Sequence, residues 1–147
     1  MPFPVDNLAE FLCGQWRLTR RLASLDTQRS GTATGQADFS LLEGTLRFHE
    51  TLQLRFDGYC GQATREHRYR LVEPHCAEVC FTDDRLFHRL DLRRGRWRDV
   101  HLCGEDVYYG SFRVLGPELW ITRWRVRGPR KDLRITTLLE REKTMEN

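Results

Sequence analysis

Several features of other protein classes are missing from this sequence of 147 residues. No apolar run reaches the roughly 20 residues that a membrane-spanning helix needs. Acidic Asp6 and Glu10 lie where a secretory signal peptide would be basic and then apolar. Internal repeats, linkers and low-complexity stretches are also absent. We therefore expect a single domain over residues 1–147 that is cytoplasmic and does not bind membranes.

Closely spaced cysteine pairs of the CxxC type are absent as well. The chain has five cysteines, an odd number: Cys13, Cys60, Cys76, Cys80 and Cys103. This pattern favours reduced thiols over a disulfide framework, because disulfide-stabilised secreted domains carry paired cysteines.

Lysine is almost missing. Only Lys131 and Lys143 accompany the arginines among 24 basic residues, and 21 acidic residues reduce the net charge to +3. The planar arginine fork suits carboxylates and phosphates, so an anionic partner fits this composition. The arginines are interleaved with the acids and scattered over the predicted strands, however, and no basic stripe or known nucleic-acid module is present. We therefore expect a salt-bridged surface and no nucleic-acid partner.

Turn-forming residues recur at short intervals, and the segments between them alternate between apolar and polar residues. This pattern predicts ten strands, at residues 14–24, 35–42, 45–56, 63–73, 77–82, 86–93, 96–103, 107–115, 119–127 and 132–141. Asp6 to Cys13 is predicted as a short helix with Asp6 as its N-cap. Ten strands connected up and down would close into an all-β antiparallel barrel, which removes exposed sheet edges.

The start of the first strand, Gly14-Gln15-Trp16, predicts how one end of this barrel is sealed. Trp16 lies where it can plug the lower end, and strand parity brings Arg141 to the same end. We expect the guanidinium group to lie over the indole ring in a cation–π contact. The opposite, upper end is expected to be the open mouth.

Alternation also predicts an unusually polar interior. The inward positions of several strands carry polar side chains, namely Arg20, Arg65, His67, His88, His101 and Tyr108. Buried polar groups without partners cost several kcal/mol, so these groups need each other, water or a ligand. We predict a small polar or anionic ligand, paired by the arginines and oriented by the histidines and the tyrosine. An internal network, for instance Arg20 with Glu50, is the alternative.

A second cationic feature is the turn Gly128-Pro129-Arg130-Lys131-Asp132. Lys131 and Arg130 would project positive charge at the open rim and attract an anion. Alternatively, Asp132 accepts from the turn amides while both cations are solvated.

Three other functions stay open. His67, His88 and His101 with Cys103 could hold a metal or haem iron, although they lack the spacing of zinc modules, and no metal is predicted. A histidine with Tyr108 and a buried arginine could perform acid–base chemistry, as in an isomerase or decarboxylase. A scaffold could instead dock a protein on its arginine-rich ninth strand, which predicts an interior filled by side chains. No motif points to a particular cofactor or oligomeric state.

Motifs along nearly the whole chain resemble an uncharacterised lipocalin-like (calycin) family, a domain of unknown function. They are Phe11-Leu12-x-Gly14-x-Trp16, Phe87-His88-x-Leu90-Asp91-Leu92, His101-x-Cys103-x-x-Asp106-x-Tyr108-x-Gly110-x-Phe112 and Trp124-Arg125-Val126-x-Gly128-Pro129-x-Lys131-Asp132. Asp84 departs from the glycine expected after Asp83. The resemblance implies a calycin-like barrel and important roles for His88, His101, Asp106, Tyr108, Arg125 and Lys131. Arg125 and Lys131 therefore join the predicted ligand-binding residues, although alternation places Arg125 outside.

Overall fold

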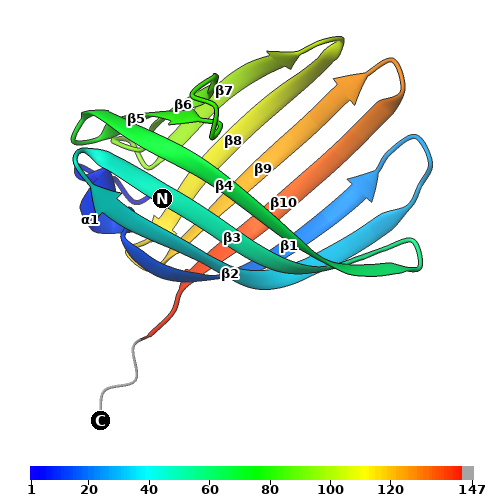
Figure 1. Cartoon of the computed structure of the whole chain (residues 1–147), viewed down its shortest axis with the longest axis horizontal. Helices are drawn as coiled ribbons and strands as arrows, with labels where there is room; N and C mark the ends of the chain where they lie inside the picture. The colour runs from blue at the N-terminus through cyan, green and yellow to red at the C-terminus, as the bar shows by residue number, and fades with distance from the viewer. Residues whose placement is uncertain (144–147) are drawn as a thin grey trace.

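One antiparallel sheet of ten strands curls into a nearly closed barrel with a short helix at one end (Figure 1). The computed structural model describes residues 1–143, so the last four residues of the predicted domain lie outside the described residues. The elements are α1 (Leu8–Leu12), β1 (Gly14–Ser24), β2 (Ser30–Leu42), β3 (Thr45–Phe56), β4 (Tyr59–Glu73), β5 (Cys76–Cys80), β6 (Leu86–Asp91), β7 (Arg96–Cys103), β8 (Asp106–Gly116), β9 (Leu119–Gly128) and β10 (Lys131–Arg141).

The predicted all-β barrel of up-and-down strands is confirmed. The strand order is β6-β5-β4-β3-β2-β1-β10-β9-β8-β7, so β1 pairs with β10 and the other hydrogen-bonded neighbours follow each other in sequence. Tight turns make this order possible. At the β2–β3 turn, Glu43 and Gly44 have φ values of 52° and 77°, the left-handed pair typical of two-residue hairpins.

The first elements correct two details of the prediction. β2 and β4 begin earlier than expected, at Ser30 and Tyr59. The N-cap of α1 is Asn7 rather than Asp6, because the Asn7 side chain accepts a hydrogen bond from the amide of Glu10 at 3.0 Å.

Side chains join β6 to β7, the two edge strands of the sheet. The backbone amide of Arg89 donates to the Asp99 carboxylate at 2.7 Å. The Trp97 indole donates to the Arg89 carbonyl at 2.8 Å. These contacts form a seam that closes this part of the barrel wall without a strand ladder.

The lower end is sealed as the sequence predicts. Trp16 is fully buried, and the guanidinium carbon of Arg141 lies 4.3 Å from the centre of a Trp16 ring. Arg141 also donates to the carbonyl oxygens of Cys13 and Phe11, and the Trp16 indole donates to Leu12. Helix α1, which buries Leu8 and Leu12, is thereby fastened across this end of the barrel.

In the part of the chain that the structure describes, no helix is both long and apolar enough to cross a membrane.

Candidate ligand-binding site

A small cavity with a partly polar lining lies inside the barrel, with a volume of about 40 Å³. β1, β3, β4, β6, β9 and β10 contribute polar side chains because their alternate residues face inward. Glu50 and Arg65 are direct cross-strand partners, as are Arg20 and Thr137. Apolar and aromatic side chains such as Phe48 and Trp124 complete the lining, whose polar members are Arg20, Glu50, Arg65, His67, Tyr69, His88, Thr122 and Thr137.

Glu50 is the centre of a charged network. Arg20 donates to both of its carboxylate oxygens, at 2.6 and 3.1 Å, and donates through Nε to Thr137 at 2.8 Å. Arg65 Nε lies 3.4 Å from the same carboxylate. Burial opposes ionisation of Glu50, but Arg65 and Arg20 outweigh it and hold the pKa of this carboxyl below its ordinary value. Two guanidinium groups and one carboxylate leave one excess positive charge at the cavity.

The two buried histidines are neutral hydrogen-bond acceptors toward the interior. Nδ1 of His67 lies 3.3 Å from the Cys80 carbonyl, and Nδ1 of His88 lies 2.7 Å from the Arg89 carbonyl. A carbonyl only accepts, so each Nδ1 carries the proton and each Nε2 keeps its lone pair. Burial lowers the pKa of both histidines to about 4. Nε2 of His67 is buried and has no hydrogen-bond partner within residues 1–143.

Aromatic rings continue the wall from His88 toward the upper end. The Phe87 ring stacks between Phe81 and Trp124, with centroids 4.9 and 5.0 Å away. His101 and Tyr108 contact the Phe87 ring edge-on, at 5.0 and 6.3 Å. All five of these side chains are only partly buried, so this apolar surface borders solvent.

Alternation alone misses Phe87 as an interior residue. Val79 pairs with His88 and Cys80 pairs with Leu86, so a β-bulge leaves Phe87 without a partner. Because of the bulge, the neighbouring residues Phe87 and His88 both face the barrel interior, where each ring contacts Trp124. Alternation in β10, by contrast, would have identified Thr137, which lies opposite Arg20.

The barrel interior is open to water near Arg65. This side chain is on the same face of β4 as buried His67 and Tyr69, yet it is 44% exposed. The reason is the short β5, which pairs only with the second half of β4, from Arg68 onward. Figure 1 shows β4 extending well beyond β5. A ligand could therefore reach Arg65 from the upper half of the barrel.

The predicted site residues separate into three groups in the structure. Arg20, Arg65, His67 and His88 meet at the cavity, and Arg20 forms the internal pair with Glu50 that the sequence offered as an alternative. His101 and Tyr108 belong to the aromatic wall.

Arg125 and Lys131 do not reach the cavity. Arg125 lies outside the barrel, where its guanidinium group donates to both carboxylate oxygens of Asp132 at 3.1 Å. Lys131 Nζ lies 3.0 Å from the Asp106 carboxylate beside the β9–β10 turn. Within residues 1–143, no group of three or more His, Cys, Asp or Glu side chains could hold a metal ion.

Comparison with solved structures identifies similar barrels at low sequence identity. An S-type phycobiliprotein lyase from Guillardia theta aligns over 97% of this chain and 95% of its own, with 10% identity and a TM-score of 0.65. A DUF3598 protein of unknown function from Nostoc punctiforme aligns over 96% of this chain, with 12% identity and a TM-score of 0.68. This chain spans about half of that protein (51%). A redesigned β-barrel gives 16% identity and a TM-score of 0.51, with 96% of this chain and 100% of that chain covered.

These likenesses establish a shared fold alone. No curated protein matches the sequence. A family model, described as a family of unknown function (DUF6314), matches residues 12–141, from the end of α1 to the end of β10.

Proposed function

This chain belongs to the DUF6314 family, and from the chemistry of its barrel interior we propose that it binds a small monoanionic ligand that carries a hydrogen-bond donor. The observation behind the proposal is Nε2 of His67, a buried acceptor that lacks a partner among the described residues. Leaving such a group unpaired costs about 1–3 kcal/mol, which a donor on the ligand would offset. Arg65, on the same wall, would bind the negative charge.

The charges around the cavity favour a single negative charge on the ligand. Arg20 is already engaged by Glu50 and Thr137, so it holds Glu50 in place and has little capacity left for a ligand. Arg65 shares Glu50 at longer distances and faces solvent, so its guanidinium group is the free cationic donor. One monoanion would neutralise the excess charge, and arginine suits a carboxylate or a similar oxyanion.

The size of the cavity favours an elongated ligand. A volume of about 40 Å³ holds little more than one or two water molecules or a small head group. The rest of the ligand would extend past Arg65 toward the upper end, along the partly exposed rings of Phe81, Tyr108 and Trp124. We therefore expect an amphipathic molecule with its charged end inward and an apolar or aromatic body.

Fluorescence titration with 1-anilinonaphthalene-8-sulfonate tests this proposal, because this probe combines one sulfonate, one N–H donor and an aromatic body. Arg65→Gln should weaken binding about tenfold or more through loss of a charge-assisted contact. Arg47→Gln is the matched control, because it removes the same charge from the exposed outer face of the adjacent strand β3. Equal affinities of the two variants would contradict the proposal.

His67→Phe tests whether the ligand must donate a hydrogen bond, independently of whether it must carry a negative charge. Phenylalanine keeps the ring that stacks on Phe48, but it removes the acceptor atom. The affinity for the probe should fall several-fold, while thermal unfolding verifies that the variant is folded.

Native mass spectrometry of the freshly purified protein complements the titration. An extra mass that wild type and Arg47→Gln retain and that Arg65→Gln loses would identify the size of the natural ligand.

A further inference from the structure

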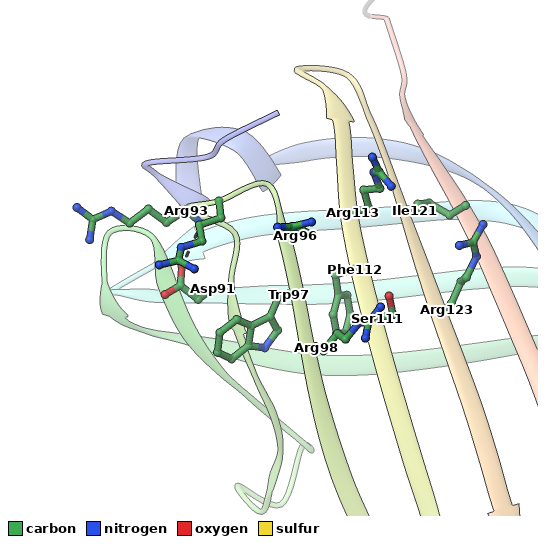
Figure 2. Close-up of a pocket in the computed structure, with 11 residues that line it drawn as sticks. Asp91, Arg93, Arg96, Trp97, Arg98, Ser111, Phe112, Arg113, Ile121 and Arg123 are labelled. Carbon is green, nitrogen blue, oxygen red and sulfur yellow. Dashed lines mark hydrogen bonds between the residues drawn. The ribbon is translucent and has the colours of Figure 1, made fainter. Parts of the chain in front are cut away.

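The outer surface of β7, β8 and β9 carries a groove of about 880 Å³ that is rich in arginine. Figure 2 shows side chains of Arg96, Arg98, Arg113 and Arg123 along these strands, with Ser111 and Ile121 between them. We call this surface the arginine groove. It lies on the opposite side of the barrel wall from the interior cavity, because its residues alternate with inward-facing Phe112 and Thr122.

The guanidinium groups of the arginine groove lack acidic partners, because Asp91, the acid that lines the groove, accepts from the Arg93 amide and contacts His75 instead. Within residues 1–143, none of the four arginines forms an ion pair. Four outward arginines on other strands do form ion pairs. The pairs are Arg17 with Glu140, Arg47 with Glu66, Arg68 with Asp84 and Arg70 with Glu78. The salt-bridged surface that the sequence predicts therefore holds for these four arginines, whereas the fold gathers four unpaired arginines into one groove on β7–β9.

Register places like charges directly against each other in this groove. Arg96 is the cross-strand partner of Arg113, and the next row aligns Arg98, Ser111 and Arg123. Directly opposed like charges destabilise a sheet. An anion bound between the opposed arginines would remove this repulsion, and the free energy gained in this way would favour its binding. The groove is thus suited to a ligand with several negative charges.

We propose that the arginine groove binds an acidic segment of a partner protein in extended conformation. Its two arginine rows are two residues apart along the strands, which corresponds to about 6.7 Å. An extended peptide with an acidic residue at every second position repeats its carboxylates at the same interval. Each carboxylate would then meet an arginine fork in one of the rows, as charge complementarity requires.

The composition of the surface favours a protein over a nucleic acid. The groove has no lysine, contains Ile121, and continues along the same face to exposed Val100 and Tyr109. Protein interfaces are enriched in arginine and aromatic residues and depleted in lysine. The net charge of only +3 would also attract a long polyanion weakly.

Fluorescence anisotropy with a labelled peptide in which glutamate alternates with threonine tests the proposal. The test variant replaces Arg96, Arg98, Arg113 and Arg123 with glutamine. The control variant makes the same change at Arg17, Arg47, Arg68 and Arg70, so both variants lose the same charge. Wild type and control should bind alike, and the test variant at least tenfold more weakly, because four exposed ion pairs are lost. Circular dichroism verifies that both variants keep the fold.

Three results would overturn the proposal. The first is equal affinity of the test and control variants, which would mean that the groove is not the binding site. The second is equally tight binding of a peptide with the same composition and its glutamates in one block, which would refute the extended register. The third is tighter groove-dependent binding of oligothymidylate at the same salt concentration, which would identify a nucleic-acid surface instead. Arg65→Gln should leave peptide binding unchanged, so this site and the interior site can fail independently.

Discussion

At the scale of single residues, Glu50 determines whether the barrel interior can hold two arginines. Glu50→Leu should destabilise the protein by about 3–5 kcal/mol, because buried Arg20 loses its partner. The double variant Arg20→Met/Glu50→Leu should recover much of that loss, since the buried guanidinium group is removed as well and the cation that remains, Arg65, is partly exposed to water. Urea unfolding measures both values. Glu140→Leu, which removes the exposed partner of Arg17, is the control and should cost about 1 kcal/mol or less.

The same measurement would contradict the network if the double variant were less stable than Glu50→Leu. Arg20 would then stabilise the interior through contacts other than its pair with Glu50.

His67 and His88 predict how stability depends on pH. An unfolded histidine has a pKa near 6.5, whereas burial lowers the pKa of both side chains to about 4 in the folded protein. Between these values the unfolded chain binds more protons, so the free energy of unfolding is complete above pH 6.5 and decreases as the pH falls toward 4. The loss is on the order of 3 kcal/mol for each histidine.

Urea unfolding between pH 7 and pH 4 checks this prediction. His67→Phe should remove roughly half of the decrease, because only His88 then titrates in the window. Glu50 does not explain a loss in this range, since its pKa is lowered and its contribution disappears only below its ordinary value of 4.5. A pH profile that is the same in His67→Phe and wild type would refute the role of His67.

At the scale of elements, the seam between β6 and β7 depends on two side chains. Asp99→Ala should remove the hydrogen bond to the Arg89 amide and destabilise the protein by about 1–3 kcal/mol. Hydrogen exchange is the direct measurement, because the Arg89 amide should lose much of its protection while amides of the β1–β10 ladder keep theirs. Asp57→Ala, on an exposed turn far from the seam, is the control. Unchanged exchange at Arg89 would mean that the seam is held otherwise.

The elements also indicate how far the sequence alone leads. Turn residues and alternation were sufficient for the ten strands, because both are local properties of the chain. Strand parity was sufficient to bring Arg141 over Trp16. Phe87 was missed, because a β-bulge shifts the alternation and leaves no mark in the local pattern.

The clustering of unpaired arginines on β7–β9 was missed for a different reason. Whether an outward arginine meets an acid depends on the register of neighbouring strands, as in the pair of Arg47 and Glu66 across β3 and β4. Arg96 lies in a similar local sequence to Arg47, but its cross-strand partner on β8 is another arginine, Arg113. Only the assembled sheet distinguishes these two cases, so the sequence indicated an arginine-rich ninth strand but not the groove that β7 and β8 form beside it.

At the scale of the whole molecule, the two ends of the barrel differ. α1, Trp16 and Arg141 close the lower end, while the upper half admits water to Arg65. The interior binding chemistry lies away from the closed end, next to Arg65, whereas the arginine groove on β7–β9 begins near the closed end, where Arg96 opens β7. Because one wall separates the two surfaces, a ligand inside and a partner outside could occupy the protein together.

Thiol accessibility measures this difference between the two ends. Cys60 and Cys103, at the upper end, are exposed, Cys13 and Cys76 are partly buried, and Cys80 is buried. Burial also raises the pKa of the Cys76 thiol, which slows its reaction further. Dithionitrobenzoate should therefore label two of the five thiols rapidly in the native protein.

Arg141→Met should then change which thiols react. Without the guanidinium group, the carbonyl oxygens of Phe11 and Cys13 lose their donor and Trp16 loses its cation–π contact, so α1 should detach more often. Cys13, at the end of α1, becomes the third rapidly labelled thiol, and stability falls by about 1–3 kcal/mol. Arg17→Met is the control, because Arg17 lies at the same end but is exposed and paired only with Glu140. If Cys13 reacts equally fast in both variants, Arg141 is not what holds the lower end closed, and the seal depends on the packing of Trp16 and Leu12 alone.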